Sequence, residues 1–246
     1  MVRYKLTIEY DGGAFAGWQR QENAMTVQGA LEAAITAFSG ETPTLHAAGR
    51  TDAGVHAWGQ VAHFDLARDD MSAATVRDAI NFHIRPHRAV VLDALIANLD
   101  FHARFSAISR AYRYHIVSRR APLVLESAHA WHIPGSLNAD MMQKAADMLI
   151  GKHDFSTFRA AGCQADSPLK TLDELRVERD GEKIVITARA RSFLYRQVRN
   201  MVGTLSSVGL GRWSLDDFNQ AFLACDRAQG GLTAPPHGLF FLGPLY

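Results

Sequence analysis

Hydrophobic and polar residues alternate at the start of the chain, with an apolar side chain at every second position. The apolar positions are Val2, Tyr4, Leu6, Ile8 and Tyr10. This period of two is typical of a strand with one buried face. Apolar residues then recur at helical spacing from Val27 to Phe38, between Thr26 as an N-cap and Gly40 as a stop. The sequence therefore predicts a strand, a loop and a helix in this order.

The remainder of the first half continues with shorter elements. A strand is predicted around residues 61–64, and a helix that Ser72 caps is predicted to run to Ile80. Pro86 ends the helical region because its ring is incompatible with a helix interior, and an apolar run at 89–92 resumes as a strand. A glycine-flanked polar run from Gly49 to Ala57 connects the first helix to these elements.

A similar order of elements begins again at residue 111. The predicted elements are a strand at 112–117, a helix from 138 to 150, a hairpin of 175–179 and 183–190 around Asp180-Gly181, helices from about 194 and from 214, and a strand at 239–242. The repetition predicts an α+β fold with a mostly antiparallel central sheet, made of two related split βαβ (ferredoxin-like) halves flanked by helices. We expect an N-terminal half at 1–105 and a C-terminal half at 106–246, with one catalytic cleft between them.

Composition narrows the class of protein without deciding its function. The 246 residues are 48% hydrophobic and 21% charged, which is enough apolar content for a sizeable core. Neither a signal peptide nor an apolar run of the roughly 18 to 20 residues that a membrane span needs is present, so we expect a cytoplasmic protein. Cys163 and Cys225 are too few for a disulfide framework or a zinc site.

The net charge of +1 is nearly neutral, but the arginines are unevenly distributed. No acidic residue interrupts the stretch from Arg104 to Arg120, which contains five arginines. A second group consists of Arg189, Arg191, Arg196 and Arg199. Two local basic patches on a neutral chain indicate a localised anionic partner, although each arginine could equally belong to a solvated face.

Asp52 is the strongest candidate for a reactive side chain. It lies in the polar run that Gly49 and Gly54 flank, and glycines let a backbone turn tightly and a bulky ligand approach. Aspartate is also a common turn residue, so the local pattern alone favours an ordinary turn.

Several motifs, taken together, resemble the tRNA pseudouridine synthase A family over nearly the whole chain. In the first half these are Tyr10-Asp11-Gly12, Gly17-Trp18-Gln19-Arg20-Gln21, Thr26-Val27-Gln28-Gly29 and Gly49-Arg50-Thr51-Asp52-Ala53-Gly54-Val55-His56-Ala57. In the second half they are Phe101-His102-Ala103-Arg104-Phe105-Ser106, Arg113-Tyr114, Phe193-Leu194, Val198-Arg199-Asn200-Met201-Val202-Gly203 and Thr233-Ala234-Pro235-Pro236-His237-Gly238-Leu239. The Arg50-Thr51-Asp52 run is the most specific of them.

The resemblance implies the pseudouridine synthase fold with an RNA-binding cleft. It also implies an isomerase that converts uridine to pseudouridine in the anticodon stem-loop of tRNA, at positions 38, 39 and 40. No cofactor and no metal are implied. The implied partners are tRNA and a second copy of the chain in a homodimer, with no membrane.

The resemblance also assigns a role to each of five residues. Asp52 is the implied catalytic carboxylate, and Arg199 is its implied positive partner. Arg50 is expected to help extrude the target nucleotide. Tyr112 is expected to stack on the flipped uracil, and Leu239 to form an apolar wall. The sequence leaves open whether Asp52 attacks C1′ or C6 of the nucleotide or removes a proton from the sugar.

Two short stretches depart from the family pattern. Residues 195–197 read Tyr-Arg-Gln where a histidine-rich or methionine-bearing stretch is expected, and residues 85–88 read Arg-Pro-His-Arg in place of a more apolar segment. These differences concern local RNA contacts and leave the reaction unchanged.

Two other classes of protein stay open on the residues alone. A metal-dependent hydrolase would use His46, His56 and His63 near Asp52 and Asp65, but their spacing is irregular and no H-E-x-x-H pair is present. A non-catalytic RNA-binding module on split βαβ units would need paired aromatics in RNP-like segments, which the sequence lacks.

Overall fold

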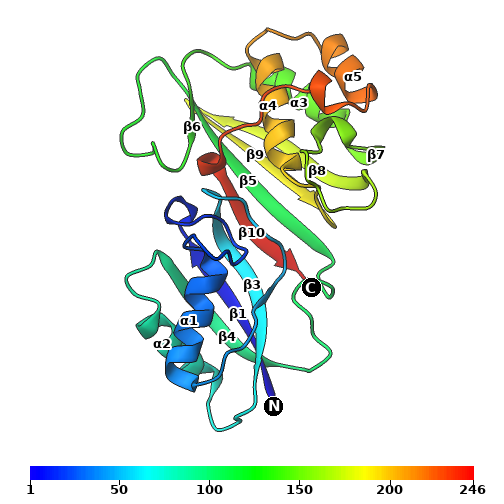
Figure 1. Cartoon of the computed structure of the whole chain (residues 1–246). Helices are drawn as coiled ribbons and strands as arrows, with labels where there is room; N and C mark the ends of the chain where they lie inside the picture. The colour runs from blue at the N-terminus through cyan, green and yellow to red at the C-terminus, as the bar shows by residue number, and fades with distance from the viewer. The chain divides into compact units, whose positions relative to one another are not determined.

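The computed structural model describes residues 1–246, which is the whole sequence. The chain divides into two compact units (Figure 1). The first unit comprises Met1–Ile108 together with Phe240–Tyr246, and the second comprises Ser109–Leu239.

The first unit is built on a mostly antiparallel sheet. Its strands are β1 (Val2–Tyr10), β2 (His46–Ala47), β3 (His56–Leu66), β4 (Ala89–Ala97) and, from Phe240 onward, β10 (Leu239–Leu245). β1 lies between β3 and β4 and is antiparallel to both, while β2 pairs antiparallel with β3. β1 and β2 are therefore parallel strands with β3 inserted between them, which is the split βαβ arrangement that the sequence predicts.

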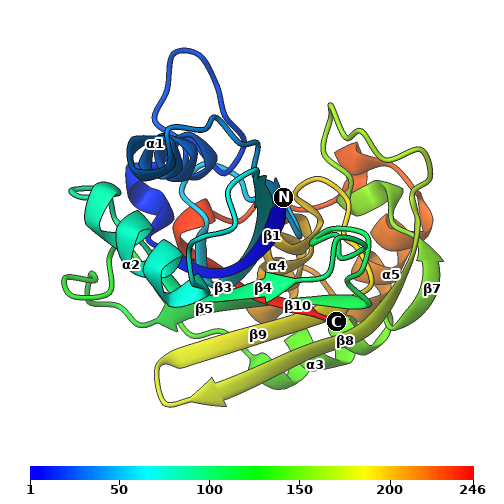
Figure 2. The same cartoon turned by 90° about the horizontal axis from the view of Figure 1, so that it is seen from below.

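Two helices connect these strands, and both begin at the residues predicted as caps. They are α1 (Val27–Ser39) and α2 (Ala73–His83). The Thr26 hydroxyl accepts a hydrogen bond from the Gly29 N–H, and the Ser72 hydroxyl accepts one from the Thr75 N–H. Gly40 ends α1 in the left-handed conformation, with φ 74°. α1 and α2 lie side by side, and α2 packs on β4 (Figure 2).

The second unit has a sheet of the same kind. Its strands are β5 (Ser109–Ser118), β6 (Trp131–Ile133), β7 (Gly151–Asp154), β8 (Leu169–Asp180) and β9 (Lys183–Ala190). β9 lies between β5 and β8 and is antiparallel to both, so β5 and β8 repeat the split βαβ arrangement. β7 pairs antiparallel with β8, and the short β6 runs parallel to β5. The predicted hairpin between β8 and β9 is confirmed, with Gly181 at φ 59°.

Three helices complete the second unit, namely α3 (Ala139–Asp147), α4 (Gln197–Gly209) and α5 (Leu215–Leu223). α3 packs against β8, α4 and α5. The predicted caps Asn138 and Ser214 are confirmed, and Ser214 forms a reciprocal capping box with Asp217. α4 begins three residues later than predicted, because its N-cap Arg196 is in the left-handed conformation at φ 58° and no side chain caps it. α3 ends at Asp147 and not at residue 150.

Each unit has its own apolar core. β1 buries one face completely, as its alternation predicts, through Tyr4, Leu6 and Ile8. In the second unit α4 is buried over nearly its whole length, because its polar residues are covered as well as its apolar face of Val198, Met201, Val202, Leu205 and Val208. Burial of each large apolar side chain contributes roughly 1.5 to 3 kcal/mol, so the cores stabilise the surfaces on which the candidate residues stand.

The predicted α+β class and the mostly antiparallel sheets are confirmed, but the last strand differs from the prediction. The sequence assigned 106–246 to the second half, whereas Phe240–Tyr246 belongs to the first unit. Phe240 and Phe241 pair in parallel with His56 and Ala57 of β3. Pairing between residues so distant in sequence leaves no local signal that a sequence pattern could reveal.

Candidate active site

Asp52 lies on a tight turn between β2 and β3. The Val55 N–H donates to the Asp52 carbonyl over 3.1 Å, and Gly54 takes the left-handed conformation at φ 78°. We name residues Gly49–Val55 the Asp52 turn. The Asp52 side chain is half-buried and Arg50 is exposed. The turn therefore presents a carboxylate and a guanidinium from one short stretch of backbone.

Side chains and backbone of the same unit hold the start of the Asp52 turn. The Gln60 side-chain amide donates to the Gly49 carbonyl over 2.7 Å. The Tyr10 hydroxyl and the Thr51 hydroxyl are 2.8 Å apart and hydrogen-bonded. The Trp18 N–H donates to the Thr51 carbonyl over 3.0 Å. The backbone on the N-terminal side of Asp52 is thus fixed at three points.

Two glycines let the chain pack directly against the Asp52 turn. A Cβ on Gly12 would lie 2.0 Å from the Val55 carbonyl oxygen, a separation that no side chain could occupy. A Cβ on Gly17 would lie 2.9 Å from the Thr51 carbonyl oxygen, and its φ of 97° is a conformation that favours glycine. The motifs Tyr10-Asp11-Gly12 and Gly17-Trp18 therefore form the seat of the turn.

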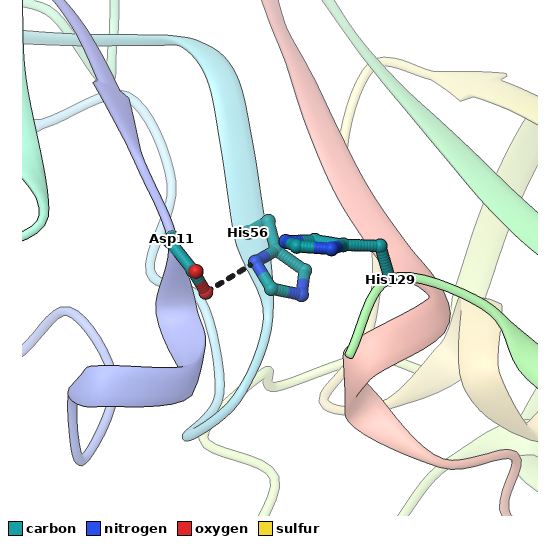
Figure 3. A group of neighbouring side chains, drawn as sticks. All are labelled: Asp11, His56 and His129. Atoms are coloured by element: carbon teal, nitrogen blue, oxygen red, sulfur yellow. Dashed lines mark ion pairs between the residues drawn. The ribbon is translucent and has the colours of Figure 1, made fainter. Parts of the chain in front are cut away.

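The end of the Asp52 turn is held by His56, the first residue of β3. Its Nδ1 accepts from the Gly12 N–H over 3.1 Å and also lies 3.0 Å from Asp11 Oδ1 (Figure 3). One nitrogen cannot accept from Gly12 and donate to Asp11 at the same time. Arg88 Nη1 lies 2.9 Å from Asp11 Oδ2, so the Asp11 carboxylate has a positive partner besides its contact with His56.

Arg199 stands on α4 in the second unit and is only 9% exposed. Its Nε donates to the Ala234 carbonyl over 2.8 Å, and the Ala234 N–H donates back to the Arg199 carbonyl over 3.1 Å. The neighbouring Asn200 is fully buried, and its amide binds the Phe158 carbonyl and the Thr233 hydroxyl. The segment at 232–236 is thereby tied to α4 and orients the planar guanidinium.

Tyr112 lies on β5 and is half-buried, with its ring edge-on to Phe193 at 5.3 Å between centroids. Tyr114, two residues later on the same face of β5, is buried and donates to the Pro235 carbonyl over 2.7 Å. Burial raises the pKa of Tyr114 well above its usual range. The Tyr114 ring packs under Gly238, immediately before the buried Leu239.

The candidate residues therefore fall into two groups. Asp52 and Arg50 belong to the first unit, and Tyr112, Arg199 and Leu239 belong to the second. Tyr10, Gly12 and Gly17 belong to the family motifs in the sequence but had no predicted role, and Gln60 belongs to none of these motifs. Their contacts with the Asp52 turn leave no local signal, since β1 and β3 become neighbours only in the folded sheet.

Comparison with known proteins identifies the family. A family model described as tRNA pseudouridine synthase matches residues 6–106 and 145–246. A protein named tRNA pseudouridine synthase A from Paramagnetospirillum magneticum is 58% identical over 246 residues, covering 100% of this chain and 96% of the relative. A protein of the same name from Rhodospirillum centenum is 55% identical over 246 residues, and the alignment covers 100% of both chains. The chain belongs to the tRNA pseudouridine synthase family.

Membership of the tRNA pseudouridine synthase family confirms the predicted enzyme class, an isomerase. It removes the metal-dependent hydrolase and the non-catalytic RNA-binding module as alternatives. Asp52, Arg50, Arg199 and Leu239 lie inside the matched segments, whereas Tyr112 falls in the interval 107–144 between them. No helix in the structure is both long and apolar enough to cross a membrane.

Proposed function

We propose that this enzyme isomerises uridine to pseudouridine in the anticodon stem-loop of tRNA, at positions 38, 39 and 40, with Asp52 as the catalytic carboxylate. The observation that carries the proposal is the Asp52 turn itself. A carboxylate on a turn that is tied at both ends by its own sheet is pre-organised, and pre-organised groups lose little entropy when they act on a substrate.

The reaction rearranges bonds without changing the composition of the nucleotide. The bond between N1 of uracil and C1′ of ribose breaks, the base rotates, and a bond forms between C5 and C1′. C5 loses its proton to solvent and N1 gains one, so substrate and product are isomers and no oxidant or reductant is consumed. An ionised carboxylate can serve as a nucleophile or a base in this sequence.

Four further residues receive proposed roles beside Asp52. Arg199 supplies the positive charge that keeps the carboxylate ionised, which its fixed and buried guanidinium suits. Arg50 is exposed next to Asp52 and assists extrusion of the nucleotide. Tyr112 stacks on the extruded uracil, and Leu239 forms an apolar wall beside it.

The deciding experiment measures tritium release from tRNA that carries C5-tritiated uridine. The wild-type enzyme is expected to release tritium, and Asp52→Asn is expected to release none above background while binding tRNA with a similar Kd. Asp69→Asn changes an exposed aspartate of the same unit and serves as the matched control. Turnover by Asp52→Asn at the wild-type rate would contradict the assignment of the catalytic residue.

The modified positions require a separate measurement. Pseudouridines in the product are located by chemical adduct formation and primer extension on tRNAs with uridines at positions 38, 39 or 40. Adducts confined to these positions are expected. Adducts in another arm of the tRNA would show that the enzyme acts outside the anticodon stem-loop.

We also propose that the enzyme is a homodimer that uses the edge strand β4. Leu92, Leu95 and Ile96 of this strand are 47%, 52% and 61% exposed, which is unusual for large apolar side chains on one short strand. Sedimentation of the wild type is expected to give twice the mass of the chain, and the double variant Leu95→Lys/Ile96→Lys to give a monomer. Leu125→Lys, at a highly exposed leucine of the second unit, is the control.

A further inference from the structure

We propose that Tyr10 and Gln60 are positioning residues, which hold Asp52 in its reactive orientation. Tyr10 does so through its contact with Thr51, and Gln60 through its contact with Gly49. This inference rests on the proposed catalytic role of Asp52. It concerns contacts inside the first unit alone, between β1, β3 and the Asp52 turn.

Gln60 fixes the beginning of the Asp52 turn. Its side chain is fully buried on β3, and its Nε2 donates to the Gly49 carbonyl over 2.7 Å. The Gly49 carbonyl is partly shielded from water and gains a donor only in one orientation of its peptide, so this contact favours that orientation. Because Arg50 follows directly, the direction in which Arg50 leaves the turn is set by the same contact.

Tyr10 fixes the residue that precedes Asp52. Its hydroxyl is hydrogen-bonded to the Thr51 hydroxyl over 2.8 Å, and both side chains are buried. Burial raises the pKa of Tyr10 to about 12, while the Thr51 and Gln60 side chains oppose that rise. The hydroxyl therefore stays protonated at neutral pH and remains able to donate a hydrogen bond.

The two contacts act on the same short stretch of backbone. Gln60 donates to the Gly49 carbonyl, and the Tyr10 hydroxyl is hydrogen-bonded to the Thr51 hydroxyl. Tyr10 and Gln60 therefore hold two positions of the turn, one on each side of Arg50, before the chain reaches Asp52.

The contacts of Thr51 act on Asp52 through the peptide bond between these two residues. The Thr51 side chain is held by Tyr10, and the Thr51 carbonyl is held by the Trp18 N–H at 3.0 Å. With both groups of Thr51 fixed, the backbone that carries the Asp52 side chain has little freedom to rotate. A displacement of about 1 Å at a reacting group can cost on the order of 100-fold in rate, so loss of this restraint should appear in kcat.

Tyr10→Phe tests the hydroxyl without removing the ring. The ring packs on Phe15 and Trp18, and phenylalanine keeps these contacts. Tyr4→Phe is the matched control because Tyr4 is a second buried tyrosine on β1, whose hydroxyl donates to the Met71 carbonyl over 2.8 Å. Tyr10→Phe is expected to lower kcat about tenfold or more with KM for tRNA unchanged within about twofold, and Tyr4→Phe to retain the wild-type kcat.

Two further substitutions test the Thr51 hydroxyl. Thr51→Val keeps the side-chain shape but removes the hydroxyl, and it should lower kcat as much as Tyr10→Phe does. Thr51→Ser is expected to restore most of the loss seen in Thr51→Val. Because Tyr10 and Thr51 share one hydrogen bond, the double variant Tyr10→Phe/Thr51→Val should lose no more activity than either single variant.

The outcomes separate this inference from the proposed function. If Asp52→Asn is inactive while Tyr10→Phe has the wild-type kcat, the positioning role is wrong and the catalytic assignment survives. If Tyr4→Phe and Tyr10→Phe lose kcat equally, the effect is one of general stability and the positioning role is again wrong. An active Asp52→Asn would instead overturn the proposed function from which this inference starts.

Discussion

The Asp52 turn in the first unit and the N-terminal part of α4 in the second present their charged residues by different means. The Asp52 turn has no regular backbone pattern, and three side chains together with two glycines hold it against its own sheet. Arg199 stands on a buried helix, and a crossing backbone segment, 232–236, sets its guanidinium. The backbone that carries Asp52 is thus held by a few specific polar contacts, whereas the backbone that carries Arg199 is a buried helix and only the guanidinium needs such a contact.

Substitution of Gly12 should break the first of these arrangements most severely. In Gly12→Ala the new Cβ would lie 2.0 Å from the Val55 carbonyl oxygen, so the Asp52 turn must move away from β1. We expect kcat to fall by at least about 100-fold. Gly13→Ala is the control because its Cβ meets only the Asp11 side chain at 3.2 Å. Equal activity of the two variants in tritium release would show that activity does not depend on the close contact between Gly12 and Val55.

The corresponding change in the second unit is Gly203→Ala on α4. Its Cβ would lie 1.8 Å from the Leu232 carbonyl oxygen, which would push the segment 232–236 away from Arg199. Overpacking of this kind costs about 1 to 3 kcal/mol, and thermal unfolding measures the cost. Gly209→Ala on the same helix meets the flexible Met142 side chain at 2.6 Å and should cost less. A larger loss in Gly209→Ala would contradict the role of the crossing segment.

Asn200→Ala should likewise act mainly on stability. The substitution removes the buried Asn200 amide, which donates to the Phe158 carbonyl and accepts from the Thr233 hydroxyl. We expect a loss of about 2 kcal/mol in the free energy of unfolding, measured by denaturant titration. Asn219→Ala, at an exposed asparagine of α5, is the control and should leave the stability unchanged.

Acid should also change the stability, and this effect concerns the first unit. Burial, together with the neighbouring His102, Arg3 and His46, lowers the pKa of His63 to about 4. The unfolded chain therefore binds a proton near pH 6.5, before the folded chain does. Stability should be constant above about pH 7 and should fall as the pH drops from about 6.5 towards 4.

His63→Gln removes the titrating group. It keeps a polar side chain near the Ala103 N–H, which donates a hydrogen bond to His63 Nδ1 in the wild type. Urea denaturation of wild type and variant at pH 7 and pH 4.5 gives the difference in free energy of unfolding. We expect the variant to lose less stability than the wild type between these two values. An equal loss would assign the acid sensitivity to other groups.

Much of the fold could be predicted because its signals are local. The N-caps Thr26, Ser72, Asn138 and Ser214 each act within three residues of chain, so the sequence placed four helix starts correctly. α4 shows the opposite case, since its N-cap Arg196 has no capping side chain and its start was misplaced. The short strands β6 and β7 were missed because three or four residues carry too little periodicity to detect.

The candidate site divides in the same way. The sequence by itself determined the candidate residues, because the Arg50-Thr51-Asp52 run and the stretch around Arg199 resemble family motifs. Only the tertiary structure decided that Tyr10 and Gln60 meet the Asp52 turn, and that Phe240 and Phe241 join the first sheet. The physical reason is that these contacts depend on strand neighbours and register, which are set when distant segments pack and leave no periodic trace in either segment alone.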